Sequence, residues 1–393
     1  MPDKHAVLSA SGSHRWLACT PSAQLETKFP PSTSVYAAEG TEAHSLAELF
    51  ASYALELIDI RTFERRYEKA KRGKYFSQEM ADCCEAYASF VRERYQNLKA
   101  EYGEAYPMLE ARIKFDAWVP DGFGTADCLL LADGHMEVID FKYGKGVRVN
   151  AYENTQMRMY TLGAYQTFGL IYDVQDIRMT IFQPRLSNGV SSDAILLEEL
   201  LEWGEIYVKP RAKLATAGQG DFAPSAETCK FCRAKAVCKA RAEENLKLFD
   251  DAPETFLLTD QEAGELLAKA ADIKAWLSDL ENYVSERLFT GEKVPGWKLV
   301  EGRSVRKYAD EAAVVNALKV AGVDEALIYK PRELITLTQL EKDFGKKKIG
   351  EILDGLIVKP EGKPTLAPES DKRPAINRVE EIKRQFDDIF EEE

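Results

Sequence analysis

The chain has 393 residues, a net charge of −13 and 45% hydrophobic residues. This length is enough for two domains, and the apolar fraction is ordinary for a folded globular protein. The acidic balance argues against a protein that coats nucleic acid non-specifically, so any affinity for nucleic acid must come from local basic patches.

The cysteine count and the hydropathy pattern indicate the compartment. The seven cysteines are an odd number, and the sequence shows no secretory leader and no apolar run long enough to span a bilayer. A secreted disulfide scaffold would instead favour paired cysteines behind a leader. We therefore expect a cytoplasmic protein with no membrane partner.

The first predicted helix covers residues 41–58. It opens on Gly40-Thr41-Glu42-Ala43-His44, and apolar residues such as Leu46 and Leu49 follow at helical spacing. Thr41 is a residue type favoured at the N-cap, which would place His44 in the first turn. A second helix is expected over residues 78–100.

Three strands are predicted next, over residues 109–115, 124–131 and 136–143. Asp133-Gly134, between the second and third strands, is typical of a hairpin turn. Side chains two apart on a strand point to the same face, so Asp140 and Lys142 should lie together. The hairpin can also bring Asp127 beside Asp140.

Two adjacent carboxylates with a lysine on the same face suit one kind of chemistry. Mg²⁺ and Mn²⁺ prefer carboxylate and water ligands and leave room for a phosphate. A lysine in that position can orient the attacking water or stabilise charge on the phosphoryl group. Asp127, Asp140 and Lys142 therefore indicate a metal-dependent phosphodiesterase.

Three more elements are predicted before the last cysteines: a helix over 151–168, a strand over 177–183 and a helix over 193–215. Gln156 and Tyr160 are four residues apart and so share one face of the first of these helices. That face either meets the carboxylates or forms a polar pair satisfied within the core.

The ordered set of motifs resembles the PD-(D/E)xK nucleases, in the variant found in RecB-like exonucleases. In that family a Gly-Thr-x-x-His helix precedes Gly-x-x-Asp, Asp-x-Lys and Gln-x-x-x-Tyr. The matching residues here are Gly40, Thr41 and His44, then Gly124 and Asp127, then Asp140 and Lys142, then Gln156 and Tyr160. The resemblance implies an α/β, restriction-endonuclease-like nuclease core framed by helices, over about residues 1–245.

The resemblance also implies a role for each residue of the site. His44, Asp127 and Asp140 would hold Mg²⁺ or Mn²⁺. Glu110 would be a further ligand or would position water, and Lys142 would position or activate the attacking water.

By the same resemblance Gln156 and Tyr160 would contact the DNA backbone, and the substrate would be an end of single-stranded or resected DNA. The whole chain also resembles an uncharacterised family encoded by phages and prophages, which implies a DNA exonuclease in phage recombination or replication inside a bacterial host. Its partners would be DNA and a phage recombinase or annealing protein, a single-strand-binding protein or a helicase. Three alternatives stay open: a sequence- or structure-specific endonuclease, a catalytically idle nuclease fold used for DNA binding or assembly, and a structural protein without catalysis whose cysteines bind zinc.

Four of the cysteines form a second signal. Cys229, Cys232 and Cys238 make a C-x₂-C-x₅-C pattern that needs one more thiolate for a four-coordinate metal, and Cys19 is the natural candidate. This split order resembles AddB-type helicase-nucleases and the CRISPR-associated adaptation exonucleases, in which one cysteine precedes the nuclease core and three follow it. The resemblance implies a [4Fe–4S] cluster that joins the two ends of the domain. Zinc is the alternative, because a C-x₂-C pair alone often binds zinc.

The composition changes after residue 249. We expect a nuclease domain over 1–249 and a mostly helical accessory domain over 250–358. Helices are predicted over 260–289, 310–321 and 337–355. An extended segment with an acidic tail should follow over 359–393, where the apolar content is low.

Overall fold

The structure, a computed structural model, describes residues 6–30, 35–250, 258–300, 311–321 and 337–345, together with Lys348 and Leu353. It consists of two compact units, Met1–Glu292 and Lys293–Glu393. The described part of the second unit includes helices α12 (Glu311–Val320) and α14 (Leu337–Phe344). The boundaries expected at residues 249 and 358 stay predictions, and the segment 359–393 lies outside the described residues.

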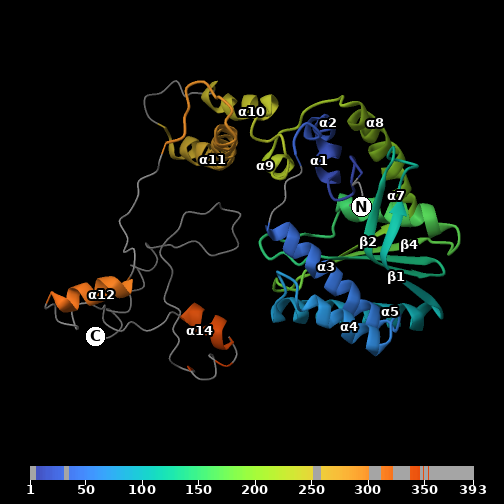
Figure 1. The fold of residues 1–393 in the computed structure, drawn as a ribbon. Coiled ribbons are helices and arrows are strands. Elements are labelled where there is room, and N and C mark those ends of the chain that lie inside the picture. Colours follow the sequence, from blue (N-terminus) through green and yellow to red (C-terminus); the bar gives the residue numbers. More distant parts are fainter. Residues whose placement is uncertain are drawn as a thin grey trace, which may run out of the picture. The chain divides into compact units, whose positions relative to one another are not determined.

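The first unit is a mixed α/β fold in which helices surround one five-stranded sheet (Figure 1). Its elements, in chain order, are α1 (Ser13–Ala18), α2 (Ser22–Glu26), α3 (Val35–Ala54), α4 (Ile60–Ala70), α5 (Gln78–Tyr102), β1 (Ala105–Lys114), β2 (Phe123–Ala132), β3 (His135–Phe141), α6 (Thr155–Ala164), the π-helical turn η1 (Tyr165–Gly169), β4 (Asp176–Phe182), β5 (Val190–Leu196), α7 (Leu197–Glu202), the π-helical turn η2 (Trp203–Val208), α8 (Lys209–Ala217), α9 (Ala226–Cys229), α10 (Lys239–Asp250) and α11 (Asp260–Phe289). Within the described ranges, no helix has both the length and the apolar composition needed to cross a membrane.

The strands follow one another across the sheet in sequence order, β1 to β5. All neighbouring pairs are antiparallel except β3 and β4, which are parallel and are joined through α6. The turn Asp133-Gly134 closes the β2–β3 hairpin as predicted, with Gly134 at φ +77°, a conformation that glycine adopts without a steric penalty.

Helices cover both faces of the sheet, which explains why β2 and β3 are apolar along most of their length. On one face α6 and α8 pack with α1, and on the other face α3 packs with α5 (Figure 1). Leu129, Leu130 and Leu131 are consecutive on β2 and at most 1% exposed, because successive side chains enter opposite cores. The central strands are thus shielded from water on both sides.

The regular alternation of faces is reversed at one point on β1. Leu109 packs in the α3–α5 core, whereas Ala111, two residues later, packs in the opposite core with α6. Between them, Glu110 has φ +47°, a left-handed conformation that is uncommon for a residue with a side chain. The pairing register with β2 is the same before and after Glu110, so the strand changes faces without shifting along its neighbour.

Several predicted elements are confirmed. The helix expected over 78–100, the three strands, the strand over 177–183 and the helix over 260–289 all form within a few residues of their predicted limits. The helix expected over 151–168 forms as α6 and η1, and it begins after Asn154, whose side chain accepts a hydrogen bond from the Met157 amide.

The predicted start of the first helix was wrong. Helix α3 already includes Val35, so Thr41 is not an N-cap and His44 is not in the first turn. The Thr41 hydroxyl instead donates to the Ala37 carbonyl at 3.0 Å, as an interior threonine does. No proline interrupts residues 35–40, and a single internal glycine is tolerated in a helix at a cost of about 1 kcal/mol.

The helix predicted over 193–215 was also partly wrong, because residues up to Leu196 belong to β5. This strand carries several small polar residues and pairs only with β4, at the edge of the sheet. An edge strand with one neighbour can be polar, so the sequence pattern did not distinguish it from a helix start.

A buried ion pair between α5 and β3 leads to a stability prediction. The fully buried Glu137 carboxylate accepts two-pronged hydrogen bonds from Arg94, the shortest at 2.9 Å, and one from Thr180. Arg94→Met leaves this charge unpaired, and we expect urea denaturation to show a loss of about 3 kcal/mol in the free energy of unfolding. Arg92→Met, an exposed neighbour on the same helix, should change it by less than about 0.5 kcal/mol. Equal losses in both variants would contradict this account.

Candidate metal centre and cysteine pocket

Three carboxylates lie at the same level of three adjacent strands. Leu109 and Ala111 pair with Cys128 and Ala126, so Glu110 of β1 stands opposite Asp127 of β2. In the next pair Cys128 faces Ile139, and extension of that register by one residue sets Asp127 opposite Asp140 of β3. The predicted neighbourhood of Asp127 and Asp140 is therefore confirmed, and Glu110 extends the row.

A histidine from α3 joins two of these carboxylates. His44 Nδ1 lies 3.2 Å from Asp127 Oδ1, and His44, Glu110 and Asp127 each offer a ligand atom within 4.8 Å of the others. The imidazole also rests edge-on against Phe141, with ring centroids 5.5 Å apart. One nitrogen and two carboxylates at this spacing form a donor set that suits a divalent cation.

Asp140 belongs to a second, adjoining set. Lys142 Nζ lies 2.9 Å from Asp140 Oδ2 and 3.2 Å from Oδ1, so the two side chains share a face as predicted. The Gln156 amide nitrogen donates to Asp140 Oδ1 and to the Tyr160 hydroxyl, and its oxygen accepts from Lys142. The Gln156–Tyr160 face of α6 thus meets the carboxylates.

One oxygen of Asp140 is left without a hydrogen bond. Among the described residues, the partner of this buried oxygen, Oδ2, is the Lys142 ammonium, with which it forms an ion pair at 2.9 Å. A carboxylate oxygen has more than one lone pair, so Oδ2 can accept a further partner beside this ammonium. It therefore fits a cation bound beside Asp127.

The charges around the site shift the pKa values of its groups. Burial of the carboxylate and the charge of Asp127 raise the pKa of Glu110 to about 7, although the residue as a whole is exposed. Burial lowers the pKa of His44, but the hydrogen bond and charge of Asp127 raise it by more, so the net shift is upward. Both groups therefore hold protons more tightly than usual when no cation balances the carboxylates.

The Asp140–Lys142 pair is shifted in the same way. Burial raises the pKa of Asp140 more than the nearby Lys142 ammonium lowers it. Burial lowers the pKa of Lys142, yet the charges of Asp140 and Asp127 outweigh that effect and raise it. Lys142 therefore remains an ammonium at neutral pH.

Backbone contacts fix the orientation of these side chains. The Phe141 amide donates to Asp127 Oδ2 at 2.7 Å, and the Lys142 amide donates to the Phe182 carbonyl of β4 at 2.9 Å. A Cβ atom on Gly124 would come within 3.0 Å of the Tyr160 ring. Glycine in the Gly-x-x-Asp motif thus leaves room for the tyrosine of α6.

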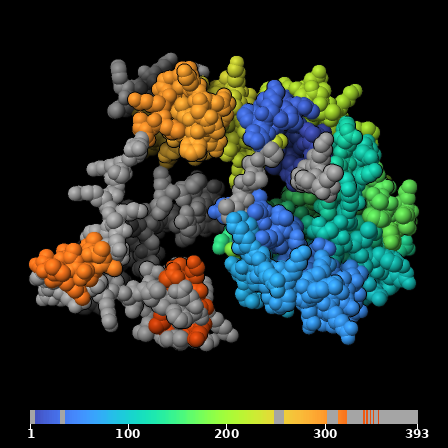
Figure 2. Space-filling model, viewed as in Figure 1, coloured from blue at the N-terminus to red at the C-terminus, as the bar shows by residue number. Residues whose placement is uncertain are grey.

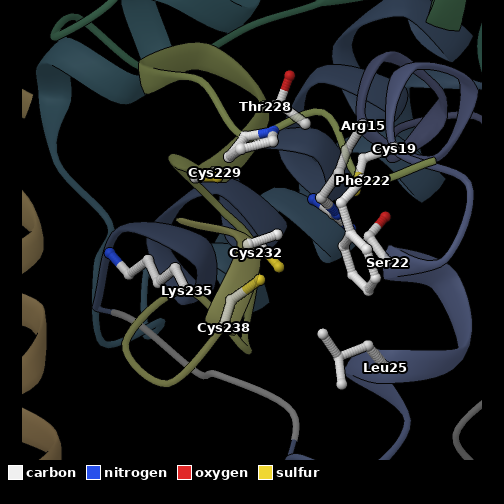
Figure 3. Close-up of a pocket in the computed structure, with 12 residues that line it drawn as sticks. Arg15, Cys19, Ser22, Leu25, Phe222, Thr228, Cys229, Cys232, Lys235 and Cys238 are labelled. Atoms are coloured by element: carbon white, nitrogen blue, oxygen red, sulfur yellow. The ribbon is translucent and has the colours of Figure 1, made fainter. Parts of the chain in front are cut away.

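The four predicted cysteines line one pocket. Cys19, Cys229, Cys232 and Cys238 all border it, although Cys19 comes from the N-terminal end of the chain. In Figure 3 the sulfur atoms of Cys232 and Cys238 point into the same space. Cys83, Cys84 and Cys128, the remaining cysteines, are not among its lining residues.

An internal network holds the two ends of the chain around this pocket. The buried Glu26 carboxylate lies 2.6 Å from Arg15 and accepts a hydrogen bond from the Arg233 amide at 2.7 Å. Thr20 donates to the Gln219 carbonyl at 2.6 Å. The segment that carries Cys19 is therefore bound directly to the segment that carries the other three cysteines.

Two sets of ion pairs near the cysteines were not predicted from the sequence. Arg15 and Glu26, on either side of Cys19, form an ion pair, and Glu26 also binds the Arg233 amide of the other cysteine segment. The only feature of the sequence that could have indicated this pair is the presence of two charged residues in short helices with several buried residues. Several basic residues of the cysteine segment are engaged within the protein: Lys235 and Arg241 pair with Asp279 of α11 at 2.7 and 2.8 Å.

Comparison with known proteins identifies the family to which the chain belongs. A family model described as "Protein of unknown function (DUF2800)" matches residues 5–374. The chain belongs to this family. Among solved structures, one titled "Crystal structure of SSO0001" is 15% identical, with 50% of this chain and 85% of that chain covered and a TM-score of 0.21.

The raised pKa of Glu110 predicts a pH effect on stability. Its folded value of about 7 lies above its ordinary value of 4.5, so the folded state binds the proton more tightly than the unfolded state. The stabilisation is present at low pH and is lost as pH rises from about 4.5 to about 7. In metal-free protein, thermal unfolding should show the wild type becoming less stable relative to Glu110→Gln across this range. A difference between the two that does not vary with pH would contradict the assignment.

Proposed function

We propose that this chain is a metal-dependent deoxyribonuclease with a PD-(D/E)xK core, which hydrolyses phosphodiester bonds at DNA ends. The observation that carries the proposal is the juxtaposition of two sets of groups. His44, Glu110 and Asp127 lie within 4.8 Å of one another, and the Asp140–Lys142 ion pair stands beside them on the next strand. A cation site with an ammonium alongside it suits the hydrolysis of an anionic ester.

His44, Glu110, Asp127 and Asp140 would hold Mg²⁺ or Mn²⁺. When bound, the ion would activate water for attack and neutralise charge on the phosphoryl oxygens. Binding requires His44 to be neutral and the carboxylates ionised, so the protons now held by His44 and Glu110 would leave. Cation binding should therefore strengthen as pH rises through about 7.

Lys142 would act as an electrostatic group rather than as a base. Its pKa is raised by Asp140 and Asp127, so the ammonium persists and can stabilise negative charge on the phosphoryl group or orient the attacking water. Gln156 holds Lys142 and Asp140 from one amide group, which limits the rotation of both. Gln156 and Tyr160 would thus position the catalytic pair. Tyr160 is buried in the core, so the half-buried Gln156 is the member of this face better placed to meet the DNA backbone.

The cysteine pocket would hold a [4Fe–4S] cluster. Tetrahedral zinc with Zn–S bonds of about 2.3 Å places its sulfurs about 3.8 Å apart. The four cysteines around one pocket offer the thiolates that either group needs, and the resemblance to the iron–sulfur nucleases favours the cluster over zinc. The cluster would supply a structural link between the N-terminal helices and the segment after α8.

The nuclease proposal predicts that activity depends on the paired groups. Asp127→Asn and Lys142→Gln should each lower Mn²⁺- or Mg²⁺-dependent cleavage of end-labelled linear DNA by at least about 10²-fold. Asp176→Asn, on the exposed start of β4, is the matched control and should retain activity. Cleavage by the wild type and equally by all three variants would refute the assignment of these residues.

Covalently closed circular DNA distinguishes an exonuclease from an endonuclease. An exonuclease degrades linear single- or double-stranded DNA and leaves covalently closed circles intact, whereas an endonuclease cuts the circles or produces discrete bands. Absence of cleavage on every substrate, with iron content and fold intact, would support an idle nuclease fold that binds DNA or assembles with a partner.

Iron content, visible absorbance and melting temperature test for the [4Fe–4S] cluster. Protein purified without oxygen should contain about four iron atoms per chain and absorb visible light. Cys232→Ser should lose the absorbance and lower the melting temperature, since the link between the chain ends is lost. Cys83→Ser, outside the pocket, should change neither property. Zinc in place of iron, in the wild type, would establish the alternative metal.

A further inference from the structure

Helix α4 and the turn that follows it carry a dense run of positive charge in an acidic chain. Residues 61–74 include only two acids, Glu64 and Glu68. The basic side chains, all of them exposed, are Arg61, Arg65, Arg66, Lys69, Lys71, Arg72 and Lys74. Like charges this close repel one another, so the run is unfavourable unless something compensates it.

The protein itself compensates little of this charge. Lys71 pairs with Glu68 at 2.6 Å, and Arg66 reaches Glu48 of α3 only at 3.9 Å. With the residues that the structure describes, the other five basic side chains make no ion pair within 4.0 Å. The cations near the cysteines differ in this respect, since Lys235 and Arg241 are engaged by acids of α11.

The apolar face of α4 is already occupied. Phe63 and Tyr67 pack against Phe50 of α3 with ring centroids 5.2 and 5.3 Å apart, and Tyr53 stacks on Phe63 at 4.7 Å. The helix is therefore anchored to α3, and it lies at the surface of the first unit (Figures 1 and 2) with its basic side chains exposed. Because the apolar side of α4 is already packed against α3, this helix is poorly suited to insert into a membrane.

Helix α3 connects the basic surface with the candidate metal centre. Thr41 and Glu48 are three and four residues from His44 on α3, so they flank it on the helix surface. Thr41 lines a groove between α3 and α4 together with Arg66 and Lys69. A chain of phosphates that leaves the metal centre across α3 would therefore reach the cations of α4.

We propose that the basic surface of residues 61–74 binds the phosphate backbone of the single-stranded nucleic acid whose ester bond the metal centre would hydrolyse. This inference rests on the proposed function. The charge is complementary to phosphate, and two of the cations, Lys71 and Lys74, lie over the rings of Tyr67 and Tyr75. A row of exposed cations without acidic partners suits a phosphate backbone, because each cation can neutralise one phosphate.

The test neutralises three exposed, unpaired cations together, as Arg65→Gln/Lys69→Gln/Arg72→Gln. The probe is a fluorescent oligodeoxythymidine, and its binding is measured by anisotropy without divalent cation at several salt concentrations. Each lost phosphate contact should lower the slope of log affinity against log salt by about 0.7, so the triple variant should lose about 2 from the slope. Its affinity at low salt should fall at least about tenfold.

The matched control removes the same charge elsewhere, as Lys213→Gln/Lys269→Gln/Lys274→Gln on α8 and α11, where all three side chains are exposed. This control should leave the salt slope unchanged. Equal effects in the two triple variants, or no effect in either, would overturn the inference, as would binding of anionic lipid vesicles in place of the oligonucleotide. If the triple variant does not fold, the single change Arg65→Glu provides the same comparison.

Cleavage is assayed separately, so the two proposals can fail independently. Cleavage with an unchanged salt slope in the α4 variant would refute the α4 surface and leave the nuclease intact. Binding that depends on α4, without any cleavage, would keep the surface and refute the catalytic role.

Discussion

The burial of negative charge within a sheet covered on both faces is the constraint on which this site depends. Asp140 is only 2% exposed, and an ionised carboxylate without partners in such a place costs several kcal/mol. Each layer supplies one compensating group: α3 brings His44 to Asp127, α6 brings Gln156 to Asp140, and Lys142, directly after β3, pairs with Asp140. The buried carboxylates thus require partners, and the helices around the sheet supply them.

The reversal of β1 at Glu110 allows both helical layers to reach the same carboxylates. A regular strand would commit each side chain to one face, and groups on α3 and α6 would then be separated by the sheet. At Glu110 and Asp127 the faces exchange, since Ala126 and Leu129 pack with α6 whereas Cys128 packs with α3 and α5. The left-handed residue costs roughly 1 kcal/mol or more, and strain of this kind is concentrated at functional sites.

Local patterns allowed much of this arrangement to be predicted from the sequence. Asp140 and Lys142 share a face because they are two apart on a strand, and the Asp133-Gly134 turn sets the hairpin that carries Asp127. The position of Glu110 in the donor set depends on a backbone conformation that packing imposes, which no local pattern indicates. The start of α3 and the edge strand β5 were missed for a similar reason: neighbouring elements decide them more than their own residues do.

The contacts between the chain ends have a consequence for synthesis on the ribosome. Thr20 and Gln219 are 199 residues apart, and Arg233 and Glu26 are 207 apart, so the N-terminal helices emerge long before their partners. At ordinary translation rates this delay is roughly 10–40 s. During that interval α1 can pack on the sheet and on α6, but its contacts with α8 and those of α2 with the cysteine segment cannot form, so the N-terminal helices stay incompletely buried.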